Sequence, residues 1–197
     1  MPHIPNSCFV RFYRSHHTMK KSFAFYFVIA SLALFSCNKE VTELPPPTQT
    51  GANTFGCKVD GKFWVPAGFG IIPTASTLET TFMGKDVLIN ARNFSSSPTE
   101  TEFELYIKDV TAPGNYPLNT TTGYPTRNVS YGYYVHRKVT PDNEWITSAE
   151  QTGMVTITKI DTVNYIISGT FQFQALNLYN TPQPISVTEG RFDVKME

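Results

Sequence analysis

Residues Asn164–Ala175 read NYIISGTFQFQA, and the alternation of apolar and polar side chains in this stretch decides the fold class. One face would carry Tyr165, Ile167, Phe171 and Phe173, and the other Ser168, Thr170, Gln172 and Gln174. A period of two places successive side chains on opposite faces of a β-strand. The stretch is therefore predicted to be a long strand with one buried face.

The same alternation recurs through most of the chain, and helical periodicity is scarce. It is found in Thr54–Asp60, Lys62–Val65, Thr77–Met83, Asp86–Arg92, Thr101–Lys108 and Arg127–Lys138. Asp60-Gly61 and Gly84-Lys85 are turn sequences between such runs. With no helix to cover a sheet, we expect an all-β domain over residues 54–197, an antiparallel β-sandwich or partly closed barrel of about nine or ten strands.

The last strand predicts a β-bulge. Ile185 and Val187 are apolar at odd positions, whereas Phe192 and Val194 are apolar at even positions. An extra residue in one strand would restore one buried face, and Gly190 is the residue expected to adopt the left-handed conformation.

The stretch Met19–Cys37, MKKSFAFYFVIASLALFSC, has the order of a secretory signal: a charged start, an apolar run and a small residue before Cys37. The apolar run is shorter than the roughly 20 residues that cross a membrane as a helix. Leu34-Phe35-Ser36-Cys37 resembles the lipobox of bacterial lipoproteins, which predicts a signal peptide at 19–36 and lipidation of Cys37. The alternative is an ordinary secretory signal. Because a complete signal begins at Met19, residues 1–18 are predicted to be an upstream extension, with translation starting at Met19.

Residues 37–53 are predicted to be the lipidated cysteine and a tether, because Pro45, Pro46 and Pro47 favour an extended, solvated chain. The first 36 residues contain four of the 16 basic residues and no acidic one, which leaves 12 basic against 16 acidic residues. A net charge of −4 without a basic run argues against a nucleic-acid partner. The expected membrane contact is through the lipid.

Removal of the signal peptide also removes most of the residues that could bind a metal or act as nucleophiles. Only His136 and Cys57 remain of the histidines and free cysteines, so a three-His or CxxC metal site and an intrachain disulfide are excluded in one chain. No cofactor is predicted. Cys57 shares a strand face with Phe55 and Val59 and is expected in the core, whereas His136, beside Arg137 and Lys138, is expected at a solvated edge.

Two groups of acidic residues could form a site. Glu100, Glu102 and Glu104 share a strand face and could bind a cation or act in glycoside hydrolysis. We favour a solvated outer face for them. Asp142-Asn143-Glu144 could supply oxygen ligands to calcium, but such residues are also typical of turns.

Aromatic residues predicted on polar faces or in loops are the better candidates for ligand binding, because exposed rings stack on sugars or anchor protein partners. These candidates are Tyr134, Trp145, Tyr106 and Tyr179. The alternative is cross-strand packing within an aromatic-rich sheet.

The segments FGCKVDGKFWVP, GMVTITKID, IISGTFQFQA and VTEGRFDVK resemble those of an uncharacterised family of small β-rich lipoproteins from Bacteroidetes-type bacteria. The resemblance implies no activity and no catalytic residue. It implies an outer-membrane location, and Asn38-Lys39-Glu40 is similar in part to the surface-export signal of such proteins, so cell-surface and periplasm-facing positions stay open.

Three hypotheses of function follow. The first is a non-catalytic binding module for a glycan or protein ligand, lipid-anchored in the cell envelope. The second is a structural subunit of a surface assembly, which predicts an exposed apolar patch or open edge strand. The third is a carboxylate-dependent glycan hydrolase, which requires acidic residues from different strands to converge in a cleft.

Overall fold

The computed structural model describes residues 41–68, 76–95, 100–137, 143–179 and 183–195. This part of the chain contains eleven β-strands and no helix. No helix in this part of the chain has the length and apolar character needed to cross a membrane. The strands are β1 (Thr54–Val59), β2 (Lys62–Trp64), β3 (Leu78–Met83), β4 (Asp86–Asn93), β5 (Glu100–Ile107), β6 (Gly114–Leu118), β7 (Tyr131–Arg137), β8 (Asn143–Ile146), β9 (Gly153–Asp161), β10 (Ile166–Asn177) and β11 (Ile185–Lys195).

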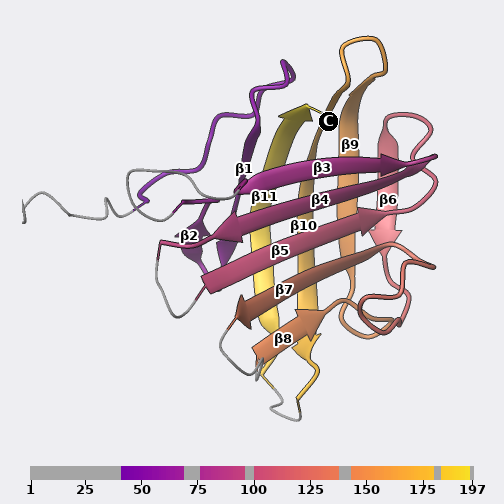
Figure 1. Ribbon diagram of the computed structural model, residues 1–197. Helices are drawn as coiled ribbons and strands as arrows, with labels where there is room; N and C mark the ends of the chain where they lie inside the picture. Colours follow the sequence, from indigo (N-terminus) through magenta and orange to yellow (C-terminus); the bar gives the residue numbers. More distant parts are fainter. Residues whose placement is uncertain (1–40, 69–75, 96–99, 138–142, 180–182, 196–197) are drawn as a thin grey trace, which may run out of the picture. The chain divides into compact units, whose positions relative to one another are not determined.

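The strands form two layers that cross steeply (Figure 1). The front sheet has the order β3-β4-β5-β7-β8, and the rear sheet has the order β2-β1-β11-β10-β9-β6. Strand β10 joins the two sheets, because most of its length pairs with β9 and β11 while Leu176 and Asn177 pair with β8. The sheets are thus one strongly curled antiparallel sheet, which confirms the prediction of an all-β sandwich or partly closed barrel.

Two hairpins have the predicted turns. Asp60 and Gly61 have φ values of 48° and 79°, the pair of left-handed residues that a type I′ turn requires. Gly84 has φ 71° in the two-residue connection between β3 and β4. Strand β6 contains Pro117 and lies at a sheet border, where a missing backbone N–H is tolerated.

The main core lies between the two sheets and is rich in aromatic rings. Phe103 is fully buried, and its ring centroid lies 4.6 Å from that of Trp64 and 5.8 Å from that of Phe55. Cys57 is also fully buried in this core, as predicted, and burial raises the pKa of its thiol far above the ordinary value. A buried neutral thiol behaves as a small apolar side chain.

The predicted bulge is present in β11. Phe171 pairs with Gly190 and Phe173 pairs with Val187, so β11 has one residue more than β10 over this interval. The left-handed residue is Glu189, with φ 53°, rather than Gly190 as predicted. Gly190 has another role: a Cβ there would lie 2.5 Å from the Phe171 carbonyl oxygen, so only glycine fits without a shift of the backbone.

Residues 41–53, assigned from the sequence to the tether, lie against the β-domain. The Asp193 carboxylate accepts hydrogen bonds from the backbone N–H groups of Thr50, Gly51 and Ala52 at 2.9, 2.9 and 3.2 Å. It also accepts from the hydroxyls of Thr48 at 2.6 Å and Ser168 at 2.7 Å. Any freely extended part of the tether therefore ends before Thr48.

Candidate functional site

Three of the four aromatic residues predicted to bind a ligand are buried. Tyr106, Tyr134 and Trp145 are 1, 4 and 7% exposed, so the expectation that these rings are accessible is wrong. Tyr179 is 47% exposed and remains available. Tyr134 and Trp145 lie in the main core, whereas Tyr106 is buried on the opposite face, because the front sheet is packed on both of its faces.

The prediction also assigned the two faces of β7 the wrong way round, so the face expected to be polar is the one that meets the main core. Tyr134 was placed on a polar face, but its ring lies in the main core 4.5 Å from the Phe103 centroid. Gly132 faces the same core, where a Cβ would lie 2.8 Å from the Phe173 ring. His136 is half-buried, with its ring 5.3 Å from that of Tyr134 and 5.1 Å from that of Trp145, and is therefore packed rather than simply solvated.

The opposite face of the front sheet carries a second cluster, with a buried centre and exposed margins, which we call the tyrosine face. It consists of Tyr106, Tyr124, Tyr131, Tyr133, Tyr179, Glu102, Glu104, Glu144, Arg92, Arg127 and Arg137. Strand register brings these residues together, since Tyr106 is opposite Tyr131, Glu104 is opposite Tyr133, and Arg92 is opposite Glu102. Tyr124 comes from the loop 119–130 and packs onto this cluster.

Glu102 and Glu104 do not form the solvated face that was predicted. They are 7 and 4% exposed, because the neighbouring tyrosines and arginines cover them. Glu102 accepts from Arg137 Nε at 2.6 Å and lies 3.5 Å from Arg92 Nε. Glu104 accepts a hydrogen bond from the Tyr131 hydroxyl and lies 3.7 Å from Arg127. Each buried carboxylate thus has a cationic partner, as burial of a charge requires.

The tyrosine hydroxyls of this face are held protonated. Burial, and then the hydrogen bond to Glu104, raises the pKa of Tyr131 far above its ordinary value. Burial and the hydrogen bond to Glu144 do the same for the pKa of Tyr133. Burial and the bond to Asp86, at 2.5 Å, raise the pKa of Tyr106 to about 12. These phenols are therefore hydrogen-bond donors to carboxylates at neutral pH.

Tyr124, Arg137 and Tyr179 of the tyrosine face reach the surface, and each contacts a neighbour within this face. Tyr124 is half-buried, and its ring stacks on Tyr133 at 3.9 Å with an interplanar angle of 3°. The side chain of Arg137 is 51% exposed and is fixed by Glu102. The hydroxyl of Tyr179 donates to Glu144 at 3.3 Å. The arrangement offers ring faces and charged hydrogen-bonding groups in fixed orientations.

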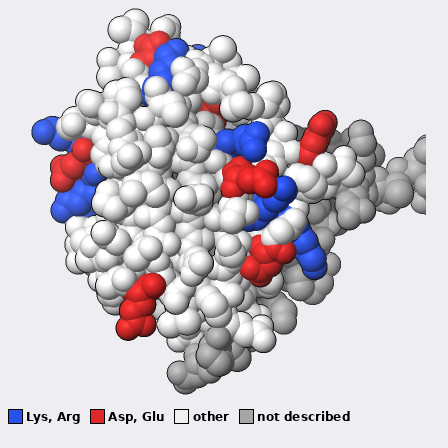
Figure 2. Space-filling model, turned by 180° about the vertical axis from the view of Figure 1, so that it is seen from behind, with Lys and Arg blue, Asp and Glu red and all other residues white. Residues whose placement is uncertain are grey.

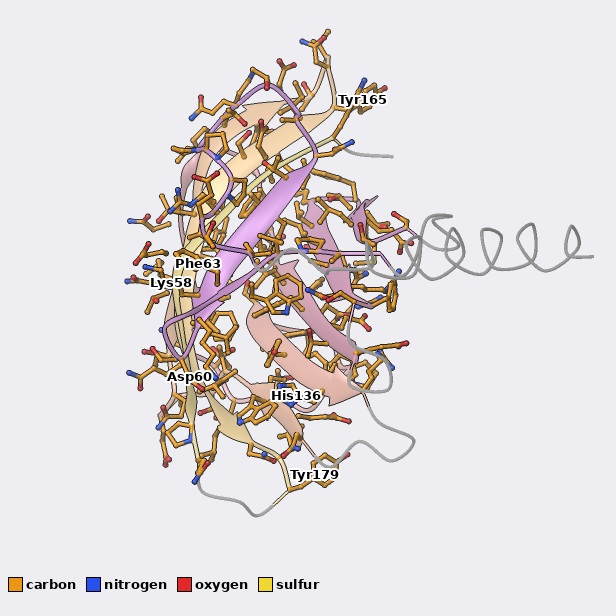
Figure 3. All side chains as sticks on the ribbon, turned by 90° about the vertical axis from the view of Figure 1, so that its left-hand side faces the viewer. Lys58, Asp60, Phe63, His136, Tyr165 and Tyr179 are labelled. Carbon is orange, nitrogen blue, oxygen red and sulfur yellow. The ribbon has the colours of Figure 1, made fainter. Side chains whose placement is uncertain are left out.

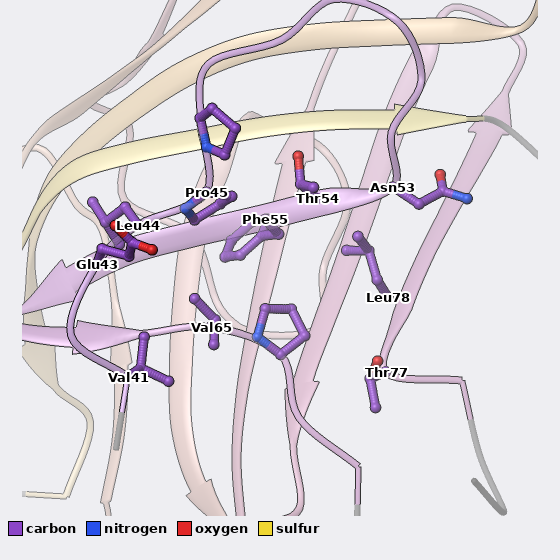
Figure 4. Close-up of a pocket in the computed structure, with 12 residues that line it drawn as sticks. Val41, Glu43, Leu44, Pro45, Asn53, Thr54, Phe55, Val65, Thr77 and Leu78 are labelled. Carbon is purple, nitrogen blue, oxygen red and sulfur yellow. The ribbon is translucent and has the colours of Figure 1, made fainter. Parts of the chain in front are cut away.

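Two other surfaces of the described part of the chain are hollowed. The outer face of the rear sheet has charged side chains toward its borders and an uncharged middle (Figure 2), where Thr170, Gln172 and Gln174 are exposed. Two shallow hollows of about 460 and 510 Å³ share Met154 and Gln172 there. An open hollow of about 710 Å³ lies beside β1 and β3 (Figure 4). The aromatic residues known to line these hollows are Phe55, Phe171 and Phe173, and all three rings are buried in the main core.

The acidic residues that the sequence suggested as metal or hydrolase sites lie on β5 and β8 in the described part of the chain. Within the described ranges, no group of three or more His, Cys, Asp or Glu side chains is placed to hold a metal ion. Asp142, one member of the candidate calcium group, lies outside the described residues. Glu102 and Glu104 come from one strand, and each is engaged by an arginine.

Comparison with known proteins gives a family but no role. No curated protein and no solved structure matches this chain. One family model matches residues 52–194, which is more than half of the 197 residues and spans all eleven strands but for the last residue of β11. The chain therefore belongs to the family described as a domain of unknown function, DUF6252.

Proposed function

We propose that this protein is a lipid-anchored envelope protein whose β-domain binds a glycan without catalysis, through the tyrosine face. The observation that supports the binding site is the set of accessible side chains Tyr124, Arg137 and Tyr179, each oriented by a neighbour: the buried Tyr133 and Glu102, and the half-buried Glu144. Groups held in place before binding lose less conformational entropy when a ligand arrives.

The chemistry of the site suits a neutral sugar better than an ion. Three arginines balance the three glutamates of the tyrosine face, and the contacts among them already neutralise most of the charge. The ring faces of Tyr124 and Tyr179 can pack against the C–H face of a sugar ring. Arg137 can donate to sugar hydroxyls, and Glu144 can accept from them.

Glycan binding is tested with the purified protein on an array of neutral and charged glycans. We expect a neutral glycan to bind, and we expect Tyr124→Ala and Tyr179→Ala each to weaken binding at least about tenfold, the loss of one aromatic contact of about 1.4 kcal/mol. Tyr165→Ala is the matched control, because Tyr165 is 60% exposed and projects at the opposite end of the molecule from Tyr179 (Figure 3).

Two results would count against this proposal. Equal losses in the Tyr165 control and the site variants would place binding elsewhere. Release of shorter sugars from a bound glycan would support the hydrolase hypothesis instead of a binding module.

The anchor is tested separately through Cys37. When the protein is made with its signal, we expect it to fractionate with membranes and to incorporate a labelled fatty acid. Cys37→Ser should abolish the label and move most of the protein to the soluble fraction, since several acyl chains are needed for durable attachment. An unlabelled protein that remains soluble without the change would contradict lipidation but not glycan binding.

A second function, a structural subunit of a surface assembly, is favoured by one specific observation. Strand β3 ends the front sheet and pairs only with β4 among the described residues.

A further inference from the structure

The outer face of the sheet carries two exposed leucines where β10 ends. Leu176 lies in β10 and is 40% exposed, and Leu178 directly follows the last residue of β10 and is 46% exposed. A single exposed leucine is ordinary on a protein surface, whereas neighbouring ones mark a place where an apolar part of a ligand can bind. We call Leu176 and Leu178 the leucine pair.

Strand register places the leucine pair beside Glu144 of the tyrosine face. Leu176 is opposite Ile146 of β8, which packs against the buried tyrosines of that face. The Leu178 N–H donates to the Glu144 carbonyl at 2.8 Å, so the antiparallel pairing continues past the end of β10 and Leu178 is opposite Glu144. Side chains of opposed residues share one face, with Cβ atoms about 5 Å apart. The leucine pair therefore lies on the tyrosine side of the sheet, with Leu178 as the cross-strand neighbour of Glu144.

The Glu144 carboxylate is a hydrogen-bond acceptor at the margin of this surface. Glu144 is half-buried, and the hydroxyls of Tyr133 and Tyr179 donate to it, the second at 3.3 Å. An ionised carboxylate has about four lone-pair sites for hydrogen bonds and no donor. Glu144 can therefore also accept from a ligand, and it is matched to a ligand group that donates.

Arg137 supplies a donor on the same face. Its side chain is 51% exposed, and its Nε donates to Glu102 at 2.6 Å. Arg137 lies two residues from Val135, which is opposite Glu144. Diagonal neighbours in a sheet are about 7 to 8 Å apart, which is within reach of a long side chain. Because the guanidinium carries further N–H donors, Arg137 can bind an acceptor atom that lies next to Glu144.

We propose, building on the proposed function, that the glycan bound by the tyrosine face contains an N-acetylated amino sugar. Its acetamido N–H donates to Glu144, its acetyl oxygen accepts from Arg137, and its methyl group packs against the leucine pair. A sugar with a hydroxyl in place of the acetamido group can bond to Glu144 but leaves both leucines in contact with water. An N-acetylated sugar is also uncharged, in keeping with the balanced charges of the tyrosine face.

The ligand class is tested with the purified protein and matched pairs of oligosaccharides that differ only in the acetamido group. The pairs are N-acetylglucosamine against glucose and N-acetylgalactosamine against galactose, in the same linkages, and calorimetry measures each affinity. We expect the N-acetylated member of one pair to bind about tenfold more tightly, a difference of about 1.4 kcal/mol. The methyl group covers apolar surface and the amide N–H pairs with a carboxylate, and both contacts strengthen binding.

A variant with both Leu176→Ser and Leu178→Ser should reduce this preference to under about threefold, because the methyl group loses its apolar contact. Val163→Ser is the matched control and should keep the preference. Val163 is 83% exposed and lies two residues from Tyr165, which projects at the opposite end of the molecule from Tyr179 (Figure 3).

Equal affinity for both members of every pair, or a preference that survives in the leucine variant, would overturn the proposed ligand class. If Tyr124→Ala and Tyr179→Ala weaken the binding of both members in that case, glycan binding at the tyrosine face stands without it. If none of these oligosaccharides binds but another neutral glycan binds on the array, the ligand class is again wrong and the proposed function holds. If no glycan binds at all, both are wrong.

Discussion

Replacing Asp193 by alanine is expected to lower the free energy of unfolding by about 3 kcal/mol, because a buried carboxylate with several hydrogen-bond donors is removed at once. Its partners include three consecutive backbone N–H groups, at Thr50, Gly51 and Ala52. These donors must then find water, and the segment 48–53 is expected to leave the domain. Chemical unfolding of the purified protein measures the loss.

The Asp193 carboxylate should also make the stability of the protein depend on pH. Burial alone would raise the pKa of Asp193, but hydrogen bonds from Thr48, Ser168 and the backbone of Thr50 and Gly51 lower it well below its ordinary value. The unfolded chain therefore takes up a proton at a higher pH than the folded protein does. The stabilisation is complete above about pH 4 and is lost as the pH falls through the folded pKa. Asp193→Asn should remove this part of the pH dependence.

Two variants separate the carboxylate from its surroundings. Asp193→Asn keeps the shape but presents an amide N–H group to donors, so we expect a loss of about 2 kcal/mol. Thr50→Ala removes a hydroxyl that lies 3.4 Å from Asp193 and leaves the Thr50 backbone bond intact, so it should cost under 1 kcal/mol. Unchanged stability of the alanine variant at neutral pH would show that the segment 48–53 does not depend on Asp193.

Much of the strand order could be predicted because alternation is a local property. Asn164–Ala175 was predicted as a strand, and β10 runs from Ile166 to Asn177 with buried and exposed residues alternating over its second half. The Asp60-Gly61 turn and the bulge in β11 were also recognisable, since turn residues and a change of parity are both visible in short stretches of sequence.

The tyrosine face could not be predicted, because alternation separates two faces but does not say what covers each. Glu102 and Glu104 alternate with Phe103 as predicted, yet they are buried by tyrosines, by Arg137 of β7 and by Arg127 of the loop 119–130. Tyr124, which packs over them, lies on a loop with no periodicity of its own. Both faces of β7 are aromatic, so polarity could not indicate which one meets the main core.

The contact between the segment 48–53 and Asp193 also could not be predicted from local sequence patterns. Some 140 residues separate the two partners, and the proline-rich composition nearby predicted an extended tether. The one sequence feature that could have indicated a folded segment is Gly51, because glycine readily adopts left-handed conformations. Its φ is 74°, a conformation that a solvated polyproline segment does not use.

Phe103→Ala is expected to produce the largest loss of stability, about 4 kcal/mol, because the ring lies where the two sheets meet. Its centroid is within 6.5 Å of rings from both sheets, including Tyr134 of β7, Trp64 of β2 and Phe171 of β10. The side chain has no exposed surface, so its removal leaves a cavity that rigid neighbouring rings cannot fill by small movements. Thermal and chemical unfolding measure the effect.

Phe63→Ala is the matched control, because Phe63 is 39% exposed and undergoes the same chemical change outside the main core. We expect it to cost under about 1 kcal/mol, including the loss of its contact with Lys58. Phe103→Leu retains most of the volume and should cost less than Phe103→Ala. Equal losses at Phe103 and Phe63 would mean that the two sheets are not held together by this aromatic cluster, since burial is the main property in which the two positions differ.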